Sequence, residues 1–344
     1  EDREKKSYQN QIVKNEQSAL PHMQNFNEKK STISFITASD EKYAAFSSEC
    51  LKQLEKYSPS TKKHFYSFNF ENKNNNIFLG NDIRFLKIDK MKSISNLCDN
   101  TFHFAKIRAC LDAIETIDSD YYIWIDSDAN AFKNIENIFG YFGLLEDYPL
   151  CPIYFDDNIS QWREINGVRK TAYYGEEILR KFGIERSNNF IVCANLFVFN
   201  KQCKNFFEEV ISIGEELREK DVNDFFVDDN AFSEERIFNY LFWKNGYKNH
   251  LPITWVSKGW QSNKKYTLDF DSCVLNDIFD HDFDLMFIYK DRYNINIKKE
   301  DVILFHSKPN QKSLKSTIEL ARKYNVTNEN NVTNGEGVNT EEIV

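Results

Sequence analysis

Two carboxylates stand two residues apart at the end of an apolar segment, in the stretch YYIWIDSDANAF (residues 121–132). Five mostly β-prone residues lead directly into Asp126, Ser127 and Asp128. Alternate side chains of a strand share a face, so both carboxylates can converge on one point. Two carboxylates at such a short distance repel each other, and a divalent cation between them relieves that repulsion. The stretch predicts that Asp126 and Asp128 hold Mg²⁺ or Mn²⁺ with phosphate oxygens; a solvated acidic turn is the alternative.

The elements around this stretch predict an α/β fold. Strands are expected in STISFITASD, KKHFYSFNF, DIRFLKID and YYIWIDSD, and helices in EKYAAFSSECLKQLEKY and FHFAKIRACLDAIETI. Strands that alternate with amphipathic helices indicate a central, mostly parallel sheet flanked by helices. Ligands bind beyond the carboxyl ends of such strands, where the polar segments TASDEKY and DSDAN both fall.

The second half of the chain mixes strands and helices. It contains the β-prone run NNFIVCANLFVFN, the helical patterns KNFFEEVISIGEELREK and SEERIFNYLFWKNGY, and the short apolar runs LPITWV, DLMFIY and VILFHS. We expect a flexible polar lead-in at residues 1–30, one domain at 31–322, and a disordered polar tail at 323–344.

Composition limits the classes of function. The 344 residues are 41% hydrophobic and 28% charged, with a net charge of -9, which argues against general nucleic-acid binding. No apolar run reaches 18 residues, so no membrane span is expected. No signal peptide is visible, but the chain starts at Glu1, and an upstream signal or anchor could have been removed. Both a cytoplasmic and a secretory-lumenal location stay open, and the oligomeric state cannot be read.

The seven cysteines are scattered and form no CxxC pair. This spacing disfavours a zinc site or a dense disulfide framework. We expect mostly buried free thiols, with one or two disulfides as the alternative.

Six segments in order carry a resemblance to a known family: ISFITASDEKY, FHFAKIRACL, IWIDSDANAF, VCANLFVFN, FSEERIFNYLFWKNGYKNHLP and VILFHSKPN. Together they resemble glycosyltransferases of the GT-A fold, most of all the retaining glycogenin-like and galactosyltransferase-like group (family 8). The resemblance covers residues 33–310 and implies a Rossmann-like GT-A domain.

The resemblance implies that the first segment binds the donor nucleotide through Thr37, Ala38, Asp40 and Tyr43. A carboxylate can accept a hydrogen bond from a uracil N–H, and a tyrosine ring can stack on the base. A helix N-cap at Ser39 or Asp40, with local packing of Tyr43, is the structural alternative.

The resemblance also implies cationic contacts to the donor. Phe104-Ala105-Lys106 stands where the family has Tyr-Ala-Arg, so Lys106 takes the place of the arginine, and Arg108 is a second candidate. Lysine is a point charge and cannot form the bidentate contacts of arginine. A solvated helix face is the alternative for both. Ser127, inside the acidic triplet, is also expected to contact the donor.

Contacts to the transferred sugar are implied at Asn195, Glu234 and Glu235. Cys193-Ala194-Asn195 replaces the family's Asn-Ala-Gly, so the asparagine is displaced by two positions. Glu234 and Glu235 stand at the family's Asp-Gln pair, and Asn239 at its helical asparagine. An acidic first turn of a helix is the alternative for the glutamates.

His306 is implied to complete the metal shell, and Lys308 in the HSKP segment to touch the diphosphate. The resemblance thus implies an Mn²⁺- or Mg²⁺-dependent hexosyltransferase that moves a sugar, with retention, from a UDP-sugar to a hydroxyl of a glycan, protein or lipid. Residues 154–181 are the expected acceptor segment.

Three alternatives remain open. The enzyme could invert, with Glu234 or Glu235 as the base. The chain could bind a nucleotide-sugar or glycan without turnover. A nucleotidyltransferase ranks lowest, because TASDEKY lacks a glycine-rich phosphate loop.

Overall fold

The computed structural model describes residues 31–70, 82–89, 101–131, 136–156, 162–165, 168–171, 175–185, 190–221, 234–251, 256–259 and 304–307. The expected lead-in (1–30), the expected tail (323–344) and the expected strand DLMFIY lie outside these residues. The predicted domain limits therefore stay predictions.

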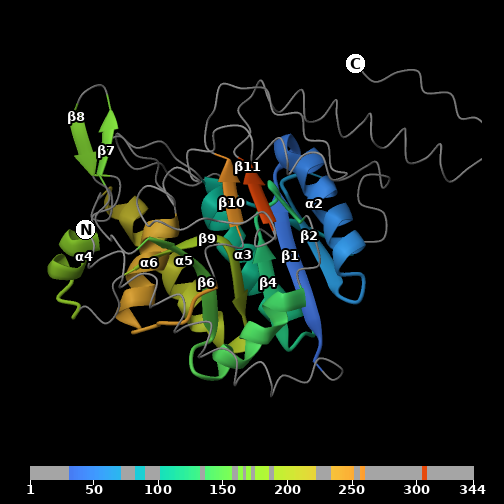
Figure 1. Ribbon diagram of the computed structural model, residues 1–344. Helices are drawn as coiled ribbons and strands as arrows, with labels where there is room; N and C mark the ends of the chain where they lie inside the picture. Colours follow the sequence, from blue (N-terminus) through green and yellow to red (C-terminus); the bar gives the residue numbers. More distant parts are fainter. Residues whose placement is uncertain are drawn as a thin grey trace, which may run out of the picture.

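A six-stranded sheet in the order β3-β2-β1-β4-β9-β6 forms the centre of the molecule (Figure 1). Its strands are β1 (Ile33–Ser39), β2 (Lys62–Phe68), β3 (Asp82–Leu86), β4 (Tyr121–Ile125), β6 (Leu150–Asp156) and β9 (Ile191–Phe199). The first four in spatial order run parallel, whereas β9 is antiparallel to both of its neighbours. The prediction of a mostly parallel sheet is confirmed.

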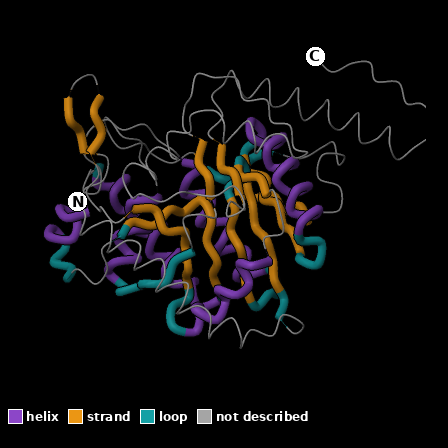
Figure 2. The backbone as a smooth tube through the Cα atoms, in the orientation of Figure 1, coloured by secondary structure: helices purple, strands orange, loops and turns teal. Residues whose placement is uncertain are grey.

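Helices cover both faces of this sheet (Figure 2). On β4, Tyr122 and Trp124 join the core beneath α3 (Thr101–Thr116), α5 (Lys204–Lys220) and α6 (Glu234–Lys244). Ile123 and Ile125 join the other core, beneath α2 (Ala44–Tyr57) and η2 (Glu136–Glu146). Successive strand residues point to opposite faces, so a continuous apolar strand feeds two cores.

Aromatic side chains fill the core beneath α3, α5 and α6. Trp124 stacks on Phe197 with ring centroids 6.2 Å apart, and Tyr122 stacks on Phe199 at 5.1 Å. The two helices α3 and α5 approach closely at Gly214, where an added Cβ would lie 2.4 Å from Phe104 Cε1. The high aromatic content is thus partly explained by packing within this core.

A three-stranded sheet in the order β10-β11-β5 lies beside the central sheet (Figure 1). It consists of β5 (Ala129–Ala131), β10 (Val256–Gly259) and β11 (Leu304–Ser307). A separate hairpin pairs β7 (Trp162–Ile165) with β8 (Val168–Thr171). The described elements are completed by η1 (Glu41–Tyr43), α4 (Gly175–Lys181) and η3 (Lys201–Cys203).

Several strands escaped prediction for physical reasons. β5 has only three residues, too few for a periodic pattern. β6 contains Pro152, and proline within an apolar run argues against a strand, except at a sheet edge, which is where β6 lies. The run LPITWV forms an isolated bridge at Leu251, and β10 begins only at its last residue, Val256.

Five of the seven cysteines are free and buried: Cys50, Cys110, Cys151, Cys193 and Cys203. This agrees with the expectation for them, while Cys98 and Cys273 lie outside the described residues. Within the described part of the chain, no helix has the length and apolar character to cross a membrane.

Candidate functional site at the carboxyl edge of the sheet

The turn from β4 into β5 places the two predicted metal-binding carboxylates at the carboxyl edge of the central sheet. The Asp126 N–H donates to Asn195 O at 2.9 Å, and the Ala129 N–H donates to Asp126 O at 2.9 Å. Asp126, Ser127 and Asp128 are half-buried. The turn is therefore anchored to β9 by backbone hydrogen bonds and still leaves its acidic residues accessible.

Backbone pairing brings His306 to this turn from the far end of the chain. His306 on β11 pairs with Ala129 on β5, the residue after Asp128, and with Lys258 on β10. The side chains of β10 and β11 are outside the described atoms, and so is Lys308.

The donor set offered by this turn fits Mn²⁺ or Mg²⁺, because it combines carboxylate oxygens with a histidine position beside them. Among the side chains that the structure describes, no three His, Cys, Asp or Glu residues gather into a group that could hold a metal ion. The third ligand therefore depends on the side chain of His306.

A buried ion pair links the acidic turn to two helices. Lys106 Nζ lies 2.7 Å from Glu234 Oε1 and 3.4 Å from Asp126 Oδ1, and it donates to Ala194 O at 3.0 Å. Asp126 Oδ1 also accepts from Trp124 Nε1 at 2.8 Å. The structure thus brings together three predicted site residues, which come from α3, α6 and the end of β4.

Charge and burial oppose each other in this ion pair. Burial by itself would lower the pKa of Lys106, but the negative charges of Asp126 and Glu234 outweigh burial and raise that pKa. Burial by itself would raise the pKa of Glu234, but Lys106 and His103 lower it. Both groups are therefore ionised near neutral pH, and Glu234 is a weak proton acceptor.

Asn195 lies in an irregular part of β9. Pro152 and Ile153 on β6 pair with Phe197 and Cys193, so the residues between those two β9 positions have no partner on β6. The Asn195 side chain is buried, and neither its Oδ1 nor its Nδ2 has a hydrogen-bond partner among the described residues. Such irregularities often lie next to active sites, and a buried amide without partners is available to a ligand.

The end of β1 contributes Thr37, Ala38, Asp40 and Tyr43 to the same edge. Asp40 Oδ1 accepts from the Tyr43 N–H at 3.1 Å and caps η1, as the structural alternative predicts. Burial first, and then the charges of Asp128 and Asp40, raise the pKa of Tyr43. Thr37 Oγ1 is buried and finds no hydrogen-bond partner within the described ranges.

Two other residues take structural positions. Arg108 Nη2 pairs with Glu215 on α5, so the structure does not bring it to the ion pair at Asp126. The Asn239 side chain accepts from Val192 N and donates to Val192 O, both at 2.9 Å. This amide takes the place of a neighbouring strand at the start of β9. Glu235, next to Glu234, is half-buried.

The sequence reading missed His103. Its Nδ1 lies 3.4 Å from Glu234 Oε2, and its side chain is half-exposed. The i, i+3 spacing of His103 and Lys106 places both on one face of α3, and this spacing is the signal that could have identified it.

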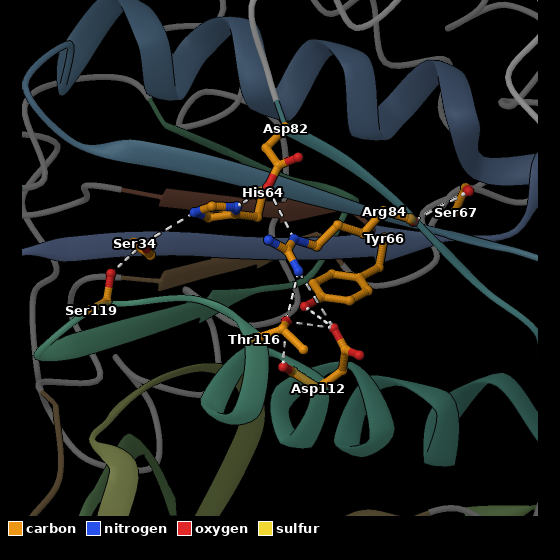
Figure 3. Close-up of polar contacts among 9 residues, drawn as sticks. All are labelled: Ser34, His64, Tyr66, Ser67, Asp82, Arg84, Asp112, Thr116 and Ser119. Atoms are coloured by element: carbon orange, nitrogen blue, oxygen red, sulfur yellow. Dashed lines mark hydrogen bonds and ion pairs between the residues drawn. The ribbon is translucent and has the colours of Figure 1, made fainter.

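A second polar cluster lies at the amino edge of the same sheet (Figure 3). We call it the amino-edge network; it comprises Ser34, His64, Tyr66, Asp82, Arg84, Asp112, Thr116 and Ser119. Ser34 Oγ lies 2.6 Å from Ser119 Oγ and 3.1 Å from His64 Nε2, and His64 Nδ1 lies 2.8 Å from Asp82 Oδ2. Arg84 continues the network from Asp82 to Thr116, and Tyr66 binds Asp112.

The Ser34, His64 and Asp82 chain has the residue types of a hydrolase triad, but it does not have the exposure of one. Ser34 is fully buried within β1, which pairs on both sides with β2 and β4. A nucleophile must be reachable by substrate, so this cluster is structural.

No protein-family model matches this chain, and no curated protein was found to match it. Among solved structures, the chain is similar to the apo structure of WbbM, a bifunctional glycosyltransferase. The two share 14% sequence identity with a TM-score of 0.49, over 85% of this chain and 50% of that chain. The chain thus spans about half the length of that protein.

Proposed function

We propose that this protein is a metal-dependent glycosyltransferase that moves a sugar from a nucleoside-diphosphate donor, a UDP-sugar, to an acceptor hydroxyl. The observation that carries the proposal is the pairing of β11 with β5, which sets His306 beside Ala129 and therefore next to Asp128. The order of the six sequence motifs supports the same function.

Asp126, Asp128 and His306 would hold Mn²⁺ or Mg²⁺. When bound, the ion would neutralise the charge that develops on the departing diphosphate. Lys308 would add positive charge from the segment after β11, and Ser127 would contact the donor from the turn itself.

The donor nucleotide would lie against the end of β1. The buried Thr37 hydroxyl has no hydrogen-bond partner in the described part of the structure, and the charge of Asp128 acts on Tyr43. Both observations support contacts of these residues to a nucleotide that enters from the acidic turn. Ala38 and Asp40 complete this surface, although the Asp40 side chain also caps η1.

Asn195 would contact the sugar through its unpartnered amide, and Glu235, in the first turn of α6, would be a second sugar contact. Glu234 is held by Lys106, and the lowered pKa of its carboxyl makes it a poor base. We therefore favour retention without a protein base over inversion with Glu234 as base. Glu235 is the remaining candidate base for an inverting enzyme.

Calorimetric titration of UDP with and without Mn²⁺ tests the proposal, on the wild type, on Asp128→Ala and on the exposed-residue control Asp147→Ala. We expect metal-dependent UDP binding in the wild type and the control, and at least about a hundredfold weaker binding in Asp128→Ala, because one of the ligands is lost. Absence of UDP binding under all metal conditions would refute the UDP-donor function.

A second experiment separates turnover from binding alone. A panel of UDP-sugars is incubated with protein and Mn²⁺, and released UDP and the anomer of the free sugar are followed by NMR. Release of the sugar as its starting anomer supports a retaining transferase. If UDP-sugars bind in a metal-dependent manner but no UDP is released from any of them, the chain is a binding protein of the same fold. The ion pair that Lys106 forms with Glu234 favours this alternative, because it holds the lysine inside the protein.

A further inference from the structure

The ammonium group of Lys106 is fully engaged inside the protein. Lysine has three N–H donors, and Nζ lies within 3.4 Å of three acceptors: Glu234 Oε1, Ala194 O and Asp126 Oδ1. Its side chain is only 12% exposed. Lys106 is therefore a fixed positive charge beside Asp126 and is not a flexible arm that reaches for a diphosphate.

The charges around Asp126 come from four elements. Lys106 and His103 lie on α3, Glu234 and Glu235 on α6, Asp126 and Asp128 on the β4–β5 turn, and Asp40 and Tyr43 at the end of β1. Of these, Lys106 is the full positive charge nearest to Asp126, and Glu234 balances it at 2.7 Å. Glu234 is buried and Lys106 is mostly buried, so salt screens their charges weakly.

This arrangement penalises a bare divalent cation. A cation on the Asp126 carboxylate would lie close to the Lys106 ammonium, and like charges at such distances repel each other appreciably in a partly buried site. A cation that carries a diphosphate has a negative overall charge, and the same ammonium attracts it. The sign of the Lys106 effect therefore depends on whether the anion is present.

We infer that the Lys106–Glu234 ion pair makes divalent-cation binding at the acidic turn dependent on an accompanying diphosphate. The pair acts as a positioning and charge-setting element of the donor site, without direct contact to the donor. This inference rests on the proposed function, because that function supplies both the cation and the diphosphate.

Two substitutions should change the affinity for Mn²⁺ alone in opposite directions. Lys106→Met removes the repelling charge, so Mn²⁺ should bind about tenfold more tightly than to the wild type. Glu234→Gln leaves Lys106 unbalanced, so Mn²⁺ should bind about tenfold more weakly. Pyrophosphate should increase the affinity for Mn²⁺ by some factor in the wild type. This factor should be smaller in Lys106→Met and larger in Glu234→Gln.

The measurement is calorimetric titration of Mn²⁺, alone and with saturating pyrophosphate or UDP, with circular dichroism to verify folding. Lys106→Arg keeps the charge and should stay near the wild type. Lys204→Met makes the same charge change on α5, where Lys204 pairs with Glu115, and should have no effect. If Lys106→Met does not fold, the near-isosteric Glu234→Gln still tests the sign.

The outcomes distinguish this inference from the proposed function. Weaker Mn²⁺ binding in both variants would indicate a purely structural pair and overturn the inference, as would unchanged binding in both. Pyrophosphate-dependent Mn²⁺ binding with the expected signs, but no UDP binding, would support the inference and refute the UDP-sugar donor. If UDP binds but the two substitutions do not change the affinity for Mn²⁺ in opposite directions, the proposed donor is supported and the inference is overturned.

Discussion

The two edges of the central sheet both carry buried polar side chains, but these side chains differ in whether they have hydrogen-bond partners. In the amino-edge network, Ser34, His64 and Asp82 bond to one another in an unbroken chain (Figure 3). At the carboxyl edge, the Asn195 amide and the Thr37 hydroxyl are buried without hydrogen-bond partners in the described part of the structure. Buried polar groups are normally satisfied. Folding alone therefore satisfies the chain of Ser34, His64 and Asp82, whereas Asn195 and Thr37 at the carboxyl edge have hydrogen-bonding capacity left for a ligand.

The largest expected effect comes from opening the buried ion pair. Lys106→Ala leaves Glu234 charged and buried, which should lower the free energy of unfolding by roughly 3–5 kcal/mol. Arg84→Ala removes a partly exposed ion pair from the amino-edge network and should cost about 1 kcal/mol. Urea denaturation measures both free energies of unfolding. Equal losses in the two variants would contradict the expectation that the more buried ion pair contributes more to stability.

A single hydroxyl tests whether the amino-edge network is structural. Tyr66 Oη donates to the Asp112 carboxylate at 2.7 Å, so Tyr66→Phe should lower the free energy of unfolding by about 2 kcal/mol. UDP binding should not change. Tyr57→Phe, at a half-buried ring on α2, is the matched control. Weaker UDP binding in Tyr66→Phe would show that the two edges are coupled.

The amino-edge network should also give stability a pH dependence. Burial lowers the pKa of His64 in spite of its bond to Asp82, so the folded protein keeps this ring neutral where the unfolded chain, with a pKa of about 6.5, binds a proton. Stability is therefore lost as the pH falls from about 6.5 through the lowered pKa. Denaturation at pH 7 and pH 5 measures how much the free energy of unfolding falls between the two. We expect a smaller decrease in His64→Gln than in the wild type, and an equal decrease would exclude a contribution of His64.

The smallest expected stability effect is at Asn195. Asn195→Ala removes two unsatisfied buried groups, so the free energy of unfolding should stay constant or rise by up to about 1 kcal/mol. The affinity for a UDP-sugar should fall, while the affinity for UDP should stay. A clear loss of stability would mean that the amide is satisfied in solution and would remove the contrast between the two edges.

Much of the fold was predictable because its strands and helices have strong patterns. The apolar runs of β1, β4 and β9 and the amphipathic pattern of α3 identified those elements, and the polar residues after β1 and β4 indicated the ligand-binding edge. Short or proline-containing strands such as β5 and β6 gave no such pattern.

The candidate site was predictable as a set of residues but not as a set of contacts. The sequence placed Lys106 and Glu234 at the donor, yet they bind each other across a long separation in the chain, which no local pattern encodes. Arg108 is two positions from Lys106, and a rotation of about 200° around the helix turns it toward Glu215 on α5. Asn239 resembled a family position but supports the backbone of β9.

The pairing of β11 with β5 also has a consequence for the order of synthesis. All six strands of the central sheet, ending with β9, leave the ribosome well before β10 and β11 are made. The sheet and both of its cores can therefore assemble on a nascent chain whose acidic turn still lacks its neighbouring strand. A polypeptide interrupted before residue 304 would keep the scaffold and both carboxylates but lose the histidine position beside them.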